Sequence, residues 1–98
     1  MICSKDLQRV YVKFFELMRN YIWEFPIVEI LADVEVGIFD SFIDADKLRK
    51  DFMKLQTNIQ PILKDDKELK EVTDKLKSLI DDLTDQQYAD LYQVQETF

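Results

Sequence analysis

Apolar side chains recur at steps of three and four residues along most of this 98-residue chain, and this spacing restricts the fold more than any other feature. Such spacing places apolar residues on one face of an α-helix, whereas a half-buried strand alternates at every second residue. Two prolines and one glycine leave few interruptions. We therefore predict an all-α protein, a single helical domain over residues 1–98, folded as a compact bundle of four main helices plus a short C-terminal fifth helix.

The first helix is predicted over about residues 5–25, with Ser4 as its N-cap. Half of the aromatic residues of the chain fall within its span, so we expect this helix to form the centre of the core. Its apolar face consists of Leu7, Val10, Tyr11, Phe14, Phe15, Met18, Tyr21, Ile22 and Phe25.

A second helix is predicted from Pro26, because proline fits the first turn of a helix, where its missing N–H costs nothing. The segment Val34–Ile38 also alternates like a strand, but no other segment offers a partner strand, so we favour a helix. The apolar face of this helix consists of Ile27, Ile30, Leu31, Val34, Ile38 and Phe42.

The third helix is predicted to begin after Asp44 or Asp46 as N-cap, to reach about residue 59, and to be ended by Pro61. Asp65 or Asp66 is predicted to cap a fourth helix. The two apolar stripes consist of Leu48, Phe52, Leu55 and Ile59, and of Leu69, Val72, Leu76, Leu79, Ile80 and Leu83.

A short fifth helix is predicted near the end of the chain. Thr84 and Gln87 have the spacing of a capping box, in which two side chains satisfy the free amides at a helix start. The apolar residues after this signal are Tyr88, Leu91 and Tyr92.

Composition excludes several classes of protein. A content of 47% hydrophobic residues is too high for a disordered chain, and a single cysteine allows no internal disulfide. The absence of histidine removes the commonest general base and metal ligand, and one glycine excludes a glycine-rich phosphate loop. The start of the chain lacks the apolar stretch of a signal peptide, and no segment has the length of a membrane span. We therefore expect a cytoplasmic protein with no membrane contact.

Acidic residues provide the first candidate surface. The formal net charge is −7, and residues 24–46 carry seven carboxylates and no cation. Glu29, Asp33, Asp40 and Asp44 are predicted to line one stripe of the second helix, which is typical of a solvated face or a partner contact. A hard cation is a weaker alternative, because no segment places glycine and glutamate as a calcium loop requires. We expect no metal and no cofactor.

Trp23 is the second candidate. Val12, Glu16, Arg19 and Trp23 follow helical steps opposite the main apolar face, and Arg19 lies in position to stack on the indole. Exposed tryptophan and arginine are enriched at binding hot spots. The alternative is that this helix is buried on both sides and that Trp23 belongs to the core.

A basic stripe on the third predicted helix and extra apolar residues on the second are two further candidate surfaces. Lys47, Lys50 and Lys54 share a face, with Arg49 nearby, which indicates a solvated helix or a patch that meets an acidic block of a second copy. The second helix also has apolar residues outside its main stripe, and a helix that is apolar on most sides is buried or forms an interface. These extra residues are Val28, Val36, Phe39 and Ile43.

These patterns favour a small cytosolic, non-enzymatic protein-binding module, acting as a regulator, adaptor or inhibitor through an acidic and apolar helical surface. The expected partner is another protein with a basic surface, or a second copy in a homodimer; direct binding to nucleic acid is disfavoured by the net charge. One alternative is an acidic mimic of nucleic acid, of phage or mobile-element origin, that inhibits a DNA- or RNA-handling enzyme. The other is a homo-oligomeric scaffold.

Overall fold

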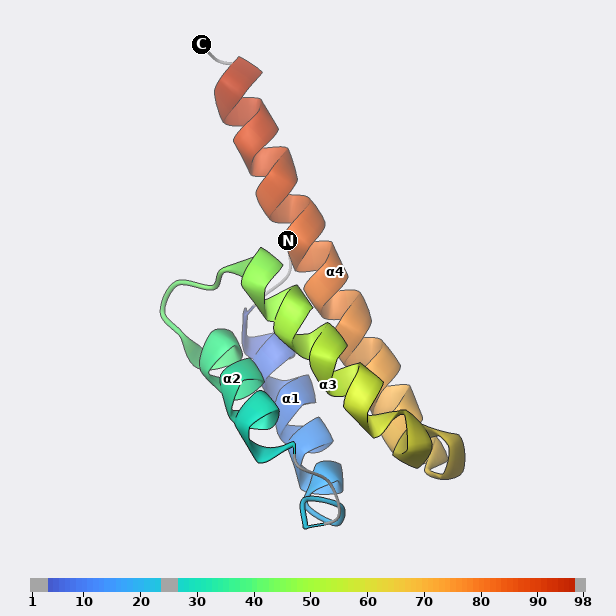
Figure 1. Ribbon diagram of the computed structural model, residues 1–98. Helices are drawn as coiled ribbons and strands as arrows, with labels where there is room; N and C mark the ends of the chain where they lie inside the picture. The colour runs from blue at the N-terminus through green and yellow to red at the C-terminus, as the bar shows by residue number, and fades with distance from the viewer. Residues whose placement is uncertain (1–3, 24–26, 97–98) are drawn as a thin grey trace.

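The computed structural model describes residues 4–23 and 27–96, with side chains described over 5–23 and 27–89. Over these residues the chain forms four α-helices and no strand, as Figure 1 shows. The helices are α1 (Ser4–Met18), α2 (Val28–Phe39), α3 (Ala45–Asp65) and α4 (Lys67–Glu96). The prediction of an all-α bundle is confirmed, and residues 34–38 are helical rather than a strand.

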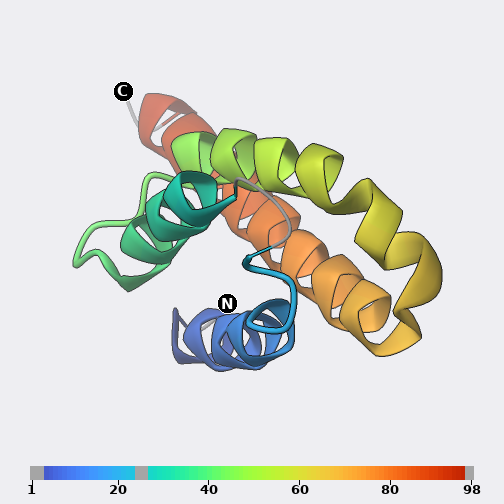
Figure 2. The same ribbon diagram turned by 60° about the horizontal axis from the view of Figure 1, so that its bottom comes forward.

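Each helix runs roughly opposite to the one before it, and the four close into a ring in which consecutive helices are neighbours and α1 packs against α4 (Figures 1 and 2). The apolar stripes meet inside this ring. The aromatic centre is the edge-on contact of Phe14 with Phe52, whose ring centroids lie 6.0 Å apart. The largest fully buried side chains are Tyr11, Phe14, Phe52, Leu7, Met18, Ile27, Ile38, Leu48, Leu55, Ile59, Leu69 and Leu76.

The first helix ends earlier than predicted. It stops at Met18, and residues 19–23 form turns in which the amides of Asn20 and Tyr21 bond to carbonyls three residues back. The Tyr21 hydroxyl donates to Asp66 Oδ2 at 2.7 Å, which ties this turn to the junction of α3 and α4. That long-range bond has no signal in the local sequence. The predicted Ser4 cap, and the predicted roles of Phe25 and Pro26, lie outside the described side chains.

The third helix begins as predicted and ends later. Asp44 caps its start by accepting from the Lys47 amide at 3.2 Å. Pro61 was expected to end the helix, but it lies inside α3, which continues to Asp65. Ile62 and Leu63 are buried after the proline, and burying such side chains contributes roughly 1.5–3 kcal/mol each, enough to offset a proline in the helix. In Figure 2, α3 bends toward the start of α4 over its last, yellow turns, as proline requires.

The structure shows no separate fifth helix among the described residues, because α4 continues without a break to Glu96. The hydroxyl of Thr84 is buried and donates to the Ile80 carbonyl one turn back, so it does not cap a new helix. Gln87 instead reaches across to the start of α3. Its amide nitrogen donates to the Ile43 carbonyl at 2.9 Å, and its oxygen accepts from the Ala45 amide at 3.2 Å. Leu91 and Tyr92 lie outside the described side chains.

The only glycine of the chain allows α2 and α3 to pack closely. Gly37 has ordinary helical backbone angles, so its role is the absence of a side chain. A Cβ atom there would lie 3.1 Å from Leu48 Cδ1, which is closer than ordinary packing. The side of α2 that carries Gly37 therefore faces α3, and the opposite side turns toward α1.

Candidate functional site

The contact between α1 and α2 is the least extensive of those between neighbouring helices in the ring. Tyr11 bridges the two helices. Its hydroxyl donates to the Leu31 carbonyl at 3.4 Å, and its ring meets Phe39 edge-on with centroids 6.0 Å apart. Burial, followed by the negative charge of Glu35, raises the pKa of Tyr11 well above its usual range, so the phenol is neutral at ordinary pH.

A shallow apolar groove runs over Tyr11 between the two helices. Its volume of about 170 Å³ is below the size of typical small-molecule pockets, so the groove suits protruding side chains rather than an enclosed ligand. Its walls are formed by Tyr11, Phe15 and Ile22 on one side and by Val28, Leu31, Ala32 and Glu35 on the other.

Exposed apolar side chains continue from this groove over the outer surfaces of α1 and α2. Val36 is 65% exposed, and Val12, Val28 and Phe39 are also exposed, while Phe15 is half-buried. We call these five residues the α1/α2 face. Three of them, Val28, Val36 and Phe39, belong to the apolar surplus predicted for the second helix, whereas Ile43 of that surplus packs partly against the core.

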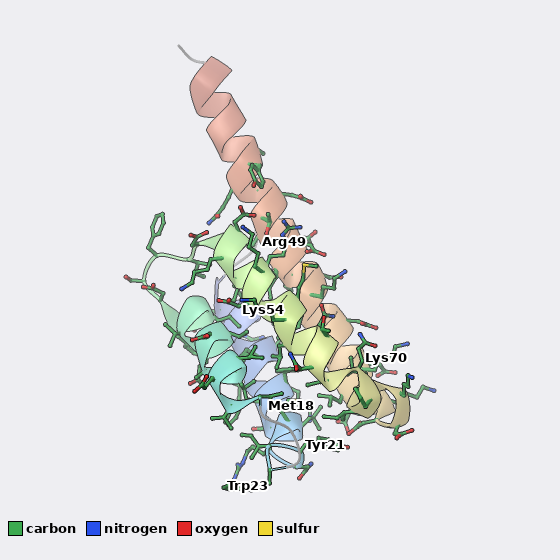
Figure 3. All side chains as sticks on the ribbon, viewed as in Figure 1. Met18, Tyr21, Trp23, Arg49, Lys54 and Lys70 are labelled. Atoms are coloured by element: carbon green, nitrogen blue, oxygen red, sulfur yellow. The ribbon has the colours of Figure 1, made fainter. Side chains whose placement is uncertain are left out.

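Trp23 is the most exposed large apolar residue described, with 93% of its surface accessible. The alternative that Trp23 belongs to the core is therefore wrong. Because α1 ends at Met18, Trp23 lies in the turn after the helix rather than on a helical stripe with Val12, as predicted. Figure 3 places it at the end of the molecule where α1 finishes, and its neighbour Ile22 closes the groove. Arg19 is exposed in the same turn, and no stacking on the indole is seen among the described side chains.

The four acidic candidates are all exposed, but they do not form the predicted stripe on one helix. Glu29 and Asp33 lie on α2. Asp40 follows the last residue of α2 and accepts from the Phe42 amide at 3.4 Å, while Asp44 caps α3. The prediction failed because α2 ends at Phe39, so the last two carboxylates satisfy backbone amides at helix ends. Among the described residues, no group of three potential ligands lies close enough to hold a metal ion.

Phe42 is a surface residue that the sequence pattern assigned to the core. It lies in the loop after α2 and is 81% exposed, because the helix that would have turned it inward has already ended. Its exposure has no sequence signal beyond the neighbouring Asp40–Ser41 pair, which is typical of a turn. Phe42 is therefore a further exposed aromatic residue, beside Trp23, Phe39 and Tyr88, among the described side chains.

The exposed side chains of α1 and α2 differ in the sign of their charges. Over its described side chains, α2 exposes Glu29, Asp33 and Glu35 and no cation. The exposed charges of α1 and its turn are mixed, with Asp6 and Glu16 among the cations Lys5, Arg9, Lys13 and Arg19. Lys13 pairs with Glu68 of α4 at 3.5 Å, on the side of α1 away from α2. Lys47, Lys50 and Lys54, which were predicted to share one face, are all exposed on α3. Figure 3 labels Lys54.

Comparison with protein-family models, curated proteins and solved structures finds no match for this chain. None of the helices, over the described residues, has the length and apolar character needed to cross a membrane.

Proposed function

We propose that this protein is a non-enzymatic protein-binding module that contacts its partner through the α1/α2 face, with Trp23 at the edge of that face. The exposure of Trp23 carries the proposal. An aromatic side chain of this kind buries about 150–250 Å², so its removal from water contributes roughly 4–6 kcal/mol before the costs of association. Tryptophan is also enriched among the residues that dominate binding energy.

The surrounding residues support a partner that is itself a protein. Arg19 lies in the same turn as Trp23, and the α1/α2 face adds apolar area beside it. Exposed carboxylates at Glu29, Asp33, Asp40 and Asp44 favour a partner that is basic where it meets them. A module that covers part of its partner's surface can act as a regulator, an adaptor or an inhibitor.

The experiment uses Trp23 as both the contact and the probe, because it is the single tryptophan of the chain. Immobilised wild-type protein and the Trp23→Ala variant are compared for capture of partners from cells that contain the protein. Met53→Ala is the matched control, since Met53 is 51% exposed but lies on α3. The expected result is that Trp23→Ala loses capture while keeping its helical circular dichroism, and that Met53→Ala behaves like the wild type.

The binding itself has a direct readout. Addition of the captured partner is expected to shift the fluorescence of Trp23 to shorter wavelength and to protect it from acrylamide quenching, because the indole leaves water. If Trp23→Ala keeps both its fold and its capture of partners, Trp23 is not the contact and the proposal fails.

A second candidate is the acidic mimic of nucleic acid, which the absence of cations over residues 24–46 favours. This candidate predicts a partner that also binds DNA or RNA, and an affinity that falls steeply between low and high salt because exposed charges are screened. Binding that is insensitive to salt would count against it.

A further inference from the structure

The last turns of α4 extend past the other helices of the bundle. Among the described side chains, the last hydrogen bonds between α4 and the region where α3 begins are made by Gln87 and Tyr88. The helix continues to Glu96, beyond the ends of the other three helices in Figure 1. We call residues 89–96 the projecting end of α4. An isolated helix needs roughly 12–15 residues to be stable in water, so a shorter segment of this kind gains most of its stability from packing.

A pocket of about 260 Å³ lies where this projection leaves the bundle. Its surface is mostly apolar, and its lining residues are Asp46, Thr84, Gln87 and Tyr88. Tyr88 is 48% exposed, so about half of its surface is available to a partner. The pocket is smaller than typical small-molecule sites, which suits one large side chain of a bound protein. In the sequence, Leu91 and Tyr92 follow Tyr88 at three and four residues, the spacing of one helix face.

The charges of this part of the chain are negative. Residues 81–98 contain five carboxylates and no cation. Asp82 and Asp85 are exposed, and neither has an ion pair among the described residues. Arg49 and Lys77, the cations that line a hollow together with Asp85, are each paired with another carboxylate. The base of the projection therefore presents carboxylates that have no cation of their own.

The end of α4 also lacks the charges that favour a helix C-terminus. The dipole of a helix places partial negative charge at this end, which cations stabilise and carboxylates destabilise. The last turn of α4 has no cation and contains Glu96. A partner that brought cations beside this turn would supply charge of the favourable sign, in addition to the attraction from the exposed carboxylates.

These charges decide between the possible occupants. A second copy that paired its own projecting end with this one would bring five more carboxylates to the contact. Nucleic acid and anionic membranes would also add negative charge. We propose that the projecting end of α4, with the pocket at its base, is the docking site for a basic amphipathic helix of a partner protein. In such a helix, apolar side chains at steps of three and four are flanked by lysine and arginine.

This docking site is separate from the surface of the proposed function. Trp23 lies at the end of the molecule where α1 finishes, whereas α4 projects from the opposite end (Figures 1 and 3). The docking site therefore adds a second contact surface, and it does not depend on the first.

The test uses a synthetic helical peptide of about 18 residues, with leucines at steps of three and four and lysines at most other positions. Binding is measured by the fluorescence anisotropy of a label on the peptide. A control peptide has glutamate in place of every lysine. The wild-type protein is expected to bind the basic peptide and not the acidic one. A wild type that does not bind the basic peptide, or that binds both equally, overturns the proposal.

Two changes at the docking site are expected to weaken this binding. Tyr88→Ala should raise the dissociation constant at least about tenfold, because it removes the exposed ring from the pocket. The pair Asp82→Asn with Asp85→Asn should raise it about fivefold. The matched control, Glu29→Gln with Asp33→Asn, removes the same charge from α2 and should change it less than about twofold. If the site variants keep their helical circular dichroism and bind as tightly as the wild type, the proposal is wrong.

The position of the bound peptide has two direct readouts. Amide hydrogen exchange is expected to slow over residues 89–96 when the peptide binds, because the projecting end of α4 gains a packing partner. The fluorescence of Trp23 is expected to stay unchanged, since the peptide contains no tryptophan and binds at the other end of the molecule. A shift of Trp23 fluorescence, with slower exchange in α2 instead, would place the peptide on the α1/α2 face. That outcome overturns the docking site on α4 and leaves the proposed function standing.

Discussion

Replacing Asp66 by alanine removes two interactions made by one carboxylate at the junction of α3 and α4. Oδ1 accepts from the Leu69 amide at 3.0 Å and caps α4, and Oδ2 accepts from the Tyr21 hydroxyl at 2.7 Å. Loss of a helix cap costs about 1 kcal/mol, and loss of the partly exposed Tyr21 bond costs about 1 kcal/mol more. We expect Asp66→Ala to lower the free energy of unfolding by about 2 kcal/mol, or the melting temperature by roughly 8–16 °C in a domain of this size.

The assay is urea and thermal unfolding followed by circular dichroism. Asp65→Ala is the matched control, because Asp65 is the exposed neighbour that the sequence pattern offered as an equal candidate for the cap, and its loss is expected to change stability by less than about 0.5 kcal/mol. A double-mutant cycle with Tyr21→Phe is expected to give a coupling of about 1 kcal/mol between the two side chains. Equal effects of Asp65→Ala and Asp66→Ala would refute the assignment of the cap.

The pH dependence provides an independent check on the same carboxylate. The Leu69 amide, followed by the Tyr21 hydroxyl, lowers the pKa of Asp66 below its usual range. A lowered pKa means that the folded state favours the charged form, so this stabilisation is complete above about pH 4 and is lost as the pH falls through the lowered value. The stability difference between the wild type and Asp66→Ala should therefore shrink on acidification, and a difference that grows would contradict the assignment.

Three further outcomes are expected. Gln87→Ala should cost about 1–2 kcal/mol in urea unfolding, because it leaves backbone groups at Ile43 and Ala45 without their partner; a cost no larger than that of an exposed Gln60→Ala would argue against this role. Tyr11→Phe should be nearly neutral at pH 7, but it should reduce the loss of stability above about pH 10, because the raised pKa of Tyr11 means that the neutral phenol stabilises the fold. An unchanged alkaline profile would contradict that reasoning. Phe14→Ala should cost about 3–5 kcal/mol and unfold much of the protein at 37 °C, as measured by its melting curve.

Local signals in the sequence were sufficient for the fold class and for several helix starts. The apolar stripes depend on neighbours three and four residues apart, so they could be identified without knowing the tertiary structure. The caps at Asp44 and Asp66 are also local, since each carboxylate bonds to an amide three residues ahead. Only the choice between neighbouring aspartates required the structure.

Helix ends and site exposure could not be predicted in the same way, because they depend on distant partners. Pro61 does not end α3, because the ring of helices buries the side chains that follow it. Gln87 has the spacing of a capping box, but the start of α3 offers it two backbone groups. Trp23 is exposed because α1 ends at Met18. In the turn that follows, the Tyr21 hydroxyl bonds to Asp66, a residue far along the chain.

The C-terminal part of α4 extends past the other three helices (Figure 1), and this projection affects how the protein moves through water. The molecule measures 52 × 23 × 21 Å, and its radius of gyration of 14.5 Å exceeds the roughly 12.6 Å expected for a compact chain of this length. An elongated particle has more frictional drag than a sphere of equal mass, so even a single chain will elute early from a gel-filtration column calibrated with compact proteins. Its sedimentation will be slow for its mass for the same reason, and elution volume alone would overstate the number of chains in the particle.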